Sequence, residues 1–274
     1  MALPTILRGL QDEVSAHMPS FRSNGFLTLG VGVGTLLCCR YYLSSRYVHC
    51  KNKETLHGKT AIISGATSGI GQAVAKELAR RHAKIIIACR DVQKGSKTAL
   101  MIRQSIPYSV DISVYDLDLA SMESVRKFAF EINKNSIDVD ILVNNAGVFC
   151  TSYTESEDHH ELDFAVNHLG HFLLTYLLLP RMKNKADARI ITVASSLYKK
   201  VVSPDFVNIN DKQSFSSMLA YARSKLANIL FTSELSKRLP KGKAFLSLLK
   251  AEVILGKREY FQIIYFIDRV DSSG

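Results

Sequence analysis

The sequence predicts an α/β protein, a doubly wound parallel sheet preceded by a single N-terminal membrane-anchor helix. Three observations lead to this prediction. Short apolar runs alternate with segments of helical spacing from residue 58 onward, a glycine-rich turn follows the first run, and a nearly uncharged stretch of 18 residues lies upstream at 26–43. Apolar strands that alternate with helices imply a parallel sheet covered on both faces. Right-handed crossovers then give the Rossmann architecture.

Length and composition limit the classes of protein. The chain has 274 residues, 47% of them hydrophobic, which suffices for one large α/β domain or two small ones. The net charge is +10, and part of the excess lies before residue 60, directly after the apolar stretch. A basic segment there is typical of a membrane flank, and no nucleic-acid motif is present, so we expect no nucleic-acid partner. The five cysteines include no C-x-x-C pair, and we expect free thiols in a reducing compartment.

The N-terminal part divides into a tail (1–25), the anchor (26–43) and a polar linker (44–57). A spanning helix needs roughly 20 apolar residues, so the stretch is long enough if Arg40 snorkels to the interface. A cleaved signal peptide, a hairpin-like insertion and a surface-lying segment are the alternatives. An uncleaved anchor is favoured because no small-residue cleavage site is evident and the basic residues follow the apolar run. Their position predicts a catalytic domain facing the cytosol, and the membrane is expected to be that of the endoplasmic reticulum.

The catalytic domain is expected to span residues 58–249. Five apolar runs predict its strands, at residues 59–63, 85–88, 112–115, 139–143 and 189–193, and a sixth candidate lies at 243–249. A helix is expected over 72–81. Another is expected over 121–133, with Ser121 as its cap and one apolar face made of Val125, Phe128, Ala129 and Ile132.

The glycine-rich turn has the spacing G-x-x-x-G-x-G between the first strand and its helix. Such a turn lets a phosphate approach the backbone, and the helix start supplies free N–H groups and a positive dipole end. The residues predicted to bind a cofactor here are Gly65, Thr67, Ser68, Gly69, Ile70 and Gly71. A tight turn with nothing bound is the alternative for the motif alone.

Four further groups fall at the carboxyl ends of the predicted strands, where this architecture binds ligands. They are 144–147 (Asn-Asn-Ala-Gly), 167–170 (Asn-His-Leu-Gly), 195–196 (Ser-Ser) and 221–225 (Tyr-Ala-Arg-Ser-Lys). The last is expected to open a long helix that runs to about Arg238. Tyr221 and Lys225, four residues apart, would share one helix face.

These motifs, in this order, resemble the short-chain dehydrogenase/reductase family over residues 58–240. The runs at 167–175 and 221–232 are most similar to the membrane-anchored retinol dehydrogenases 11 to 14, and the run 196–199 is most similar to number 14. The resemblance implies an NADP(H)-dependent oxidoreductase that interconverts retinoid-like or other lipid aldehydes or ketones and alcohols by hydride transfer. It therefore implies a small lipophilic substrate, and it leaves a homo-oligomer open.

The chemistry needs a proton on oxygen as well as a hydride on carbon. Tyr221 can donate that proton, or accept one as phenolate in the reverse reaction. Its free pKa is about 10, and the Lys225 ammonium should lower it. Ser196 can orient the carbonyl oxygen, and the resemblance implies that Asn167 holds a proton-relay water near the lysine. Taken singly, each residue has a structural alternative: packing, a solvated helix face, a turn cap or, for Asn144, support of the central sheet.

Cofactor choice depends on the end of the second strand, where Arg90 precedes Asp91. A guanidinium suits a 2′-phosphate, which favours NADP(H), whereas an acidic residue would select NAD(H). The resemblance implies that Asp118 and Leu119 lie near the adenine. It also implies that Asn145, Ala146 and Gly147 lie along the nicotinamide, with Tyr221 and Lys225 completing the cofactor contacts.

The histidines are given no catalytic or cofactor-binding role. No metal site is predicted, and packing or surface roles are expected for the histidines, His159, His160, His168 and His171.

The resemblance weakens after Leu239, and 250–274 is expected to be a divergent tail without the family's Pro-Gly segment. Within it, 260–267 would pair at the sheet edge or remain aggregation-prone. The alternative function is therefore a truncated, catalytically weak or inactive protein that binds a nucleotide or a partner.

Overall fold

The computed structural model describes residues 54–182, 188–239 and 244–251. The predicted N-terminal tail and membrane anchor, most of the linker and nearly all of the predicted C-terminal tail lie outside these residues.

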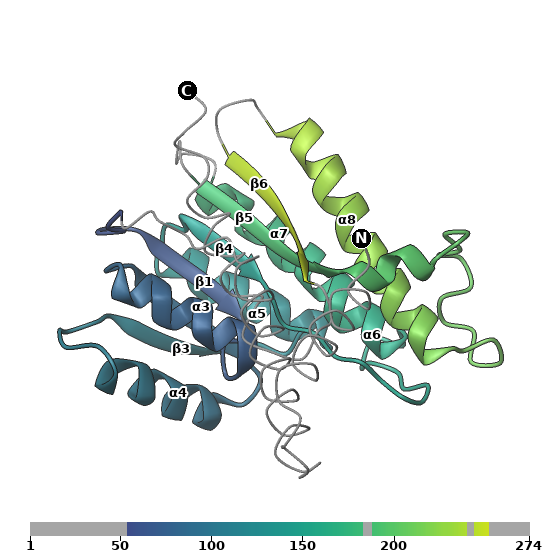
Figure 1. Cartoon of the computed structure of the whole chain (residues 1–274), viewed down its shortest axis with the longest axis horizontal. Helices are drawn as coiled ribbons and strands as arrows, with labels where there is room; N and C mark the ends of the chain where they lie inside the picture. Colours follow the sequence, from purple (N-terminus) through teal and green to yellow (C-terminus); the bar gives the residue numbers. More distant parts are fainter. Residues whose placement is uncertain (1–53, 183–187, 240–243, 252–274) are drawn as a thin grey trace, which may run out of the picture. The chain divides into compact units, whose positions relative to one another are not determined.

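Six parallel strands form one sheet in the order β3-β2-β1-β4-β5-β6 (Figure 1). Their bounds are β1 Thr60–Ser64, β2 Lys84–Cys89, β3 Ile112–Asp116, β4 Ile141–Asn144, β5 Ala188–Ser195 and β6 Ala244–Ala251. The predicted parallel sheet is confirmed, and the candidate sixth strand is present beside β5. The chain reverses its direction of winding between β1 and β4, and a doubly wound sheet binds ligands at such a point.

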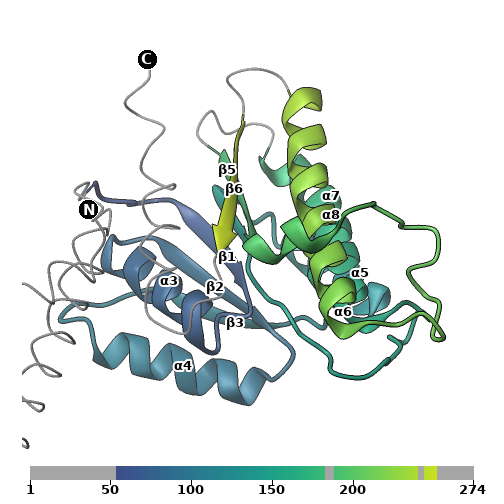
Figure 2. The ribbon, with the colours of Figure 1, turned by 45° about the vertical axis from the view of Figure 1, so that its right-hand side comes forward.

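Helices cover both faces of the sheet (Figure 2). Two of them, α3 (Gly69–Arg80) and α4 (Val92–Gln104), pack on one face, and α5 (Met122–Lys134) and α7 (Gly170–Met182) pack on the other. Side chains alternate along each strand, so Ala61 and Ile63 join the first core and Ile62 joins the second. Both cores are built from side chains that are almost completely buried.

The helix predicted over 121–133 forms as α5. Ser121 is its N-cap and accepts a hydrogen bond from Ser124 N at 3.3 Å. The four residues predicted to face the core, Val125, Phe128, Ala129 and Ile132, are all buried.

Two predicted helix starts were wrong. The first helix begins at Gly69 rather than residue 72, so the last glycines of the turn belong to its first turn. The long helix α8 (Ser217–Arg238) begins four residues before Tyr221, because the preceding residues continue the helix to a cap at Ser216. Tyr221 therefore lies in the second turn of α8 and is held by helix on both sides.

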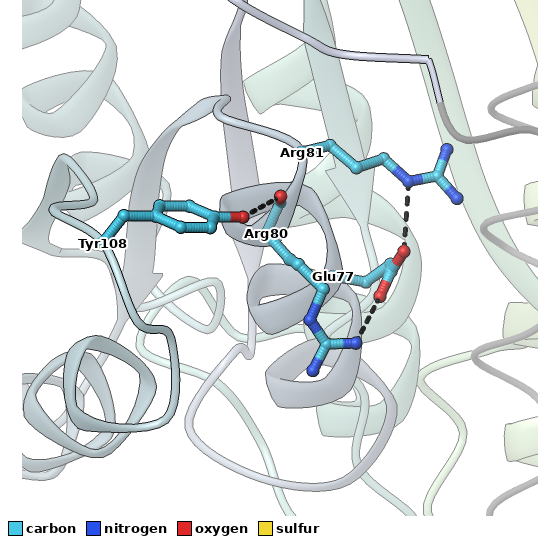
Figure 3. A network of polar contacts seen from close by, with 4 residues as sticks. All are labelled: Glu77, Arg80, Arg81 and Tyr108. Carbon is cyan, nitrogen blue, oxygen red and sulfur yellow. Dashed lines mark hydrogen bonds and ion pairs between the residues drawn. The ribbon is translucent and has the colours of Figure 1, made fainter.

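The end of α3 opposite the glycine-rich turn is held by a polar network (Figure 3). Glu77 pairs with Arg80 at 3.3 Å and with Arg81 at 3.1 Å, and the hydroxyl of Tyr108 donates to the carbonyl of Arg80. The segment that enters β1 joins here too, since Leu56 N donates to Arg81 O at 2.6 Å. This end of the sheet is therefore fixed, while its other end is left for the loops that carry the motifs.

One stretch among the described residues, Leu162–Met182, is long and apolar enough to cross a membrane. Its most apolar window is 56% buried inside the domain. Leu174, Leu178 and Met182 belong to the core, so this stretch is the central core helix of the fold.

Candidate active site

The glycine-rich turn packs directly against the loop that follows β4. Gly65 has φ +66°, and a Cβ there would lie 2.8 Å from Ala146 Cα. A Cβ on Gly71 would lie 2.5 Å from Asn145 Nδ2. Side chains at these two positions would push the turn away from the 145–146 segment, which explains why glycine occupies both.

The start of α3 has the features of a phosphate site. Gly69 has φ +54°, and among the described residues nothing lies within 4 Å of a Cβ built on it. No side chain caps this helix in the described part of the chain, whereas Asp91 caps α4 by accepting from Lys94 N at 2.9 Å. Uncapped first-turn N–H groups beside open space fit an anionic phosphate.

The other predicted residues of the turn contribute unequally. Thr67 is half-buried and Ser68 is exposed beside the helix start. The side chain of Ile70 packs against the hydrophobic core, so only its backbone faces the turn.

Ser64, which sequence analysis did not identify, joins the turn to the loop after β4. Its Oγ accepts hydrogen bonds from Asn145 N at 2.9 Å and Ala146 N at 3.1 Å. Asn145 Nδ2 donates back to Ser64 O at 3.0 Å. The Asn145 side-chain amide is thus engaged with the turn. A small polar residue at the end of an apolar strand, directly before the glycines, was the available signal.

Asn167 lies in a π-helical turn, η1 (Ala165–Leu169), of the kind often found at functional sites. Its Oδ1 accepts from Val148 N at 2.8 Å, and its Nδ2 donates to Val148 O and to Ser224 Oγ, both at 3.0 Å. A Cβ on Gly147 would lie 3.2 Å from Asn167 Oδ1 and 3.4 Å from Lys225 Nζ. Asn167 therefore fixes the loop after β4 against α8, and the absence of a side chain at Gly147 keeps the lysine beside that loop.

Tyr221 and Lys225 share one face of α8, as predicted. Lys225 Nζ lies 5.5 Å from the centroid of the Tyr221 ring and donates to Val193 O on β5 at 3.2 Å. Tyr221 is half-buried, and its ring meets the exposed ring of Phe149 edge-on at 5.4 Å. The pair thus has an ammonium on the protein side of the phenol ring and an aromatic neighbour on the solvent side.

Burial has a large effect on the lysine. It lowers the pKa of Lys225 from 10.5 to about 8, and the negative charge of Asp163 opposes this shift. A lysine with this pKa titrates near the pH at which a proton shuttle must work.

Asp163 is a second residue that sequence analysis missed. It is fully buried, and its Oδ1 accepts from Cys150 N at 2.9 Å. Burial raises its pKa, while hydrogen bonds from Cys150 and the charge of Lys225 lower it. Burial raises the pKa of the Cys150 thiol to about 12, with a further contribution from the hydrogen bond and the charge of Asp163. This thiol is therefore protonated, and not a nucleophile, at neutral pH.

The two serines after β5 have different roles. Ser195 is buried and caps the short helix η2 (Ser196–Lys200), since its Oγ accepts from Leu197 N at 3.3 Å. Ser196 is the half-buried first residue of η2, which packs against α8. The capping alternative therefore holds for Ser195, and Ser196 remains the candidate for substrate binding.

The predicted adenine-side residues lie at the ends of β2 and β3. Arg90 is exposed directly after β2, whereas Asp91 Oδ1 is engaged as the α4 cap. Asp118 Oδ1 accepts from Ala120 N at 2.9 Å within its own turn. Leu119 is buried in the core, so it can offer a ligand little more than its backbone.

The expectation that Asn144 supports the sheet is confirmed. It is buried at the end of β4, and its Nδ2 donates to Thr175 Oγ1 on α7 at 2.9 Å.

Among the residues described here, no group of three or more His, Cys, Asp or Glu side chains could hold a metal ion.

The histidines fall into two groups. His159 is exposed and lies 3.6 Å from Glu155. His168 Nδ1 lies 3.0 Å from Asn228 Oδ1, and His171 is buried with Nε2 2.8 Å from Ser64 Oγ. The last two do more than pack, because both take part in the hydrogen bonding behind the site.

A parallel doubly wound sheet with a glycine-rich first turn, and with a tyrosine–lysine pair at its carboxyl edge, is the architecture of a dinucleotide-binding oxidoreductase. The sequence profile of the short chain dehydrogenase family matches residues 59–244, and the chain belongs to this family.

Several individual proteins are similar to this chain in sequence, and they are retinol dehydrogenases. Retinol dehydrogenase 14 of Mus musculus is 47% identical over 193 residues, which cover 67% of this chain and 58% of the relative. Retinol dehydrogenases 11, 12 and 13 match at a similar level. The chain spans less than two thirds of the length of retinol dehydrogenase 14.

Solved structures share the fold. An uncharacterized protein from Mycobacterium paratuberculosis has a TM-score of 0.62 and 36% identity, covering 77% of both chains. A protein from Beutenbergia cavernae, described as an NAD(P)-dependent gluconate 5-dehydrogenase with bound NADP, has a TM-score of 0.60 and 26% identity. That match covers 74% of this chain and 76% of the other.

Proposed function

We propose that this protein is an NADP(H)-dependent oxidoreductase that interconverts retinoid-like or other lipid aldehydes or ketones and the corresponding alcohols. The observation that carries the proposal is the pair formed by half-buried Tyr221 and buried Lys225, with Lys225 donating to Val193 O on β5 and lying beside Gly147 in the loop after β4. The similarity to retinol dehydrogenases supports the substrate class.

The bound nucleotide would supply or accept the hydride at the substrate carbon. The backbone of the glycine-rich turn and the uncapped start of α3 would hold its phosphates. Tyr221 donates its hydroxyl proton to the substrate oxygen during reduction, and Ser196 orients that oxygen. The Lys225 ammonium stabilises the phenolate that remains, because an opposite charge nearby favours the ionised form.

In this proposal Asn167 holds a relay water through its side-chain oxygen. Oδ1 uses one lone pair for Val148 N–H, and its other lone pair remains for a water. Gly147 lies beside both this oxygen and Lys225 Nζ and adds no side chain between them. A water there could return a proton to the lysine after each turnover.

The function is tested by following NADPH oxidation by the full chain, purified in detergent, with all-trans-retinal. We expect turnover with retinal and much slower turnover with a short polar aldehyde of the same reactivity. Nucleotide binding without oxidation by any carbonyl compound would contradict the proposal.

The cofactor preference is proposed from Arg90. Its side chain is exposed at the end of β2, and Asp91, which would select NAD(H), is engaged as a helix cap. A related protein of known structure contains bound NADP.

Arg90→Ala should weaken NADPH binding by roughly 10- to 100-fold, because a charged hydrogen bond contributes about 1.5–3 kcal/mol. NADH binding should change little. Titration calorimetry with both nucleotides measures the two constants, and Arg80→Ala, at the far end of α3, is the matched control. Equal weakening of NADPH and NADH would reject the assignment.

The membrane anchor is also proposed, at residues 26–43, with the catalytic domain in the cytosol at the endoplasmic reticulum. Carbonate extraction should leave the full chain in the membrane pellet and release a chain that starts at residue 54. The catalytic domain should be digested by protease added to intact microsomes, and its protection would show that the orientation is wrong.

A further inference from the structure

His171 lies at the centre of a buried hydrogen-bonded chain behind the site. Its side chain is 2% exposed, Nε2 lies 2.8 Å from Ser64 Oγ, and Nδ1 lies 3.1 Å from the carbonyl oxygen of Asn167. Ser64 ends β1, and Asn167 belongs to the π-helical turn before α7. One imidazole therefore connects the glycine-rich turn to the segment that carries the proposed relay residue.

The partners of the ring determine which nitrogen carries the hydrogen. The Asn167 carbonyl can only accept, so Nδ1 must be the donor. On the other side, Ser64 Oγ already accepts from Asn145 N and Ala146 N, which uses both of its lone pairs. Its own hydrogen must therefore point away from these two N–H groups, toward an acceptor.

The hydroxyl hydrogen of Ser64 has two acceptors within reach. His171 Nε2 lies at 2.8 Å and Val143 O at 3.3 Å, so the imidazole is the better partner. A proton on Nε2 would face a hydroxyl without a free lone pair. Burial lowers the pKa of His171 to about 3, which agrees with a ring that stays neutral.

We propose that His171 is a positioning residue, which as the neutral Nδ1–H tautomer holds the nucleotide half and the proton-relay half of the site in register. Through Ser64 it orients the 145–146 segment against the glycine-rich turn. Through Nδ1 it shares the carbonyl of Asn167 with Asn228 Nδ2, which donates at 3.0 Å. This role rests on the proposed function, because it takes the glycine-rich turn and the 145–146 segment to bind the nucleotide and Asn167 to take part in proton relay.

The tautomer is measured without any substrate. The full chain, labelled with ¹⁵N-histidine in detergent, gives long-range proton–nitrogen NMR correlations that distinguish the two ring nitrogens, and His171→Gln assigns the signal. We expect Nδ1 protonated and Nε2 unprotonated, without change between about pH 5 and 8. An Nε2–H tautomer, or a ring that takes up a proton in this range, would overturn the inference even if the enzyme is active.

Two substitutions separate the two connections. His171→Asn places an amide near the position of Nδ1 and loses the bond to Ser64, so the NADPH dissociation constant should rise roughly tenfold while kcat stays within about twofold. His171→Gln reaches the Nε2 position and loses the donor to Asn167, so kcat should fall roughly tenfold at nearly unchanged NADPH affinity. The surface substitution His159→Gln is the matched control and should change neither.

The possible outcomes lead to different conclusions. The positioning role would be overturned if His171→Asn lowered kcat while His171→Gln weakened NADPH binding. It would also be overturned if each variant changed kcat and the NADPH dissociation constant equally, or if neither variant changed either quantity. If a variant does not fold, the tautomer measurement on the unaltered chain decides. If the unaltered chain binds no nicotinamide nucleotide, the proposed function fails, while the tautomer still tests the geometry of the ring.

Discussion

Tyr221→Phe should reduce carbonyl reduction by roughly 10²–10⁴-fold and leave NADPH affinity nearly unchanged. The substitution removes one hydroxyl, the proposed proton donor. The ring remains, so the contact with Phe149 and the position beside Lys225 should persist. Stopped-flow measurement of NADPH oxidation gives the rate, and nucleotide fluorescence gives the affinity.

The control for this prediction is Tyr176→Phe, since Tyr176 lies on α7 with 66% of its surface exposed. It loses the same hydroxyl away from the site and should behave as the unaltered chain. Turnover within a few-fold of normal in Tyr221→Phe would remove this tyrosine from the mechanism.

Lys225→Met should reduce activity by a similar factor, because the phenol then keeps a pKa near its free value of about 10. In the direction of alcohol oxidation, which needs the phenolate, the pH–rate profile should move to higher pH. The matched control is Lys237→Met, since Lys237 lies on the same helix and is exposed beside Glu234. An unchanged pH profile in Lys225→Met would show that the ammonium does not act on Tyr221.

The same substitution changes how stability depends on pH. The Lys225 pKa is about 8 in the folded protein against 10.5 for a lysine in an unfolded chain, so between these values the unfolded chain binds the extra proton. The free energy of unfolding contributed by this group should therefore rise with pH from about 8 to 10.5, by up to roughly 3 kcal/mol for a shift of about 2.5. Urea unfolding should show this rise in the unaltered chain relative to Lys225→Met. A constant difference between the two proteins would contradict the buried, charged lysine.

Local patterns were sufficient to predict the sheet, because each strand is a short apolar run and each motif follows one directly. The face shared by Tyr221 and Lys225 also follows from helical spacing alone. Helix starts were less certain, because α3 begins within the glycine-rich turn and α8 takes in the ordinary residues before Tyr221.

The contacts behind the site could not be predicted, because they join residues that are far apart in the sequence. Ser64 and His171 are 107 positions apart, and Asn167 and Ser224 are 57 apart. Nothing in the local sequence of a serine at a strand end or a histidine in a helix indicates the other partner. Burial of Asp163 near Lys225 depends in the same way on how η1, α6 (Leu162–Phe164) and α8 pack together.

The central claim is that the Tyr221–Lys225 site transfers hydride between NADPH and a lipid carbonyl. Isotope transfer tests it most directly. The full chain in detergent is given all-trans-retinal and NADPH that carries deuterium at the transferable position, and the retinol product is analysed by mass spectrometry. We expect retinol with one deuterium on the former carbonyl carbon, and almost none from Tyr221→Phe. Retinol without deuterium, or equal labelling by both proteins, would contradict the claim.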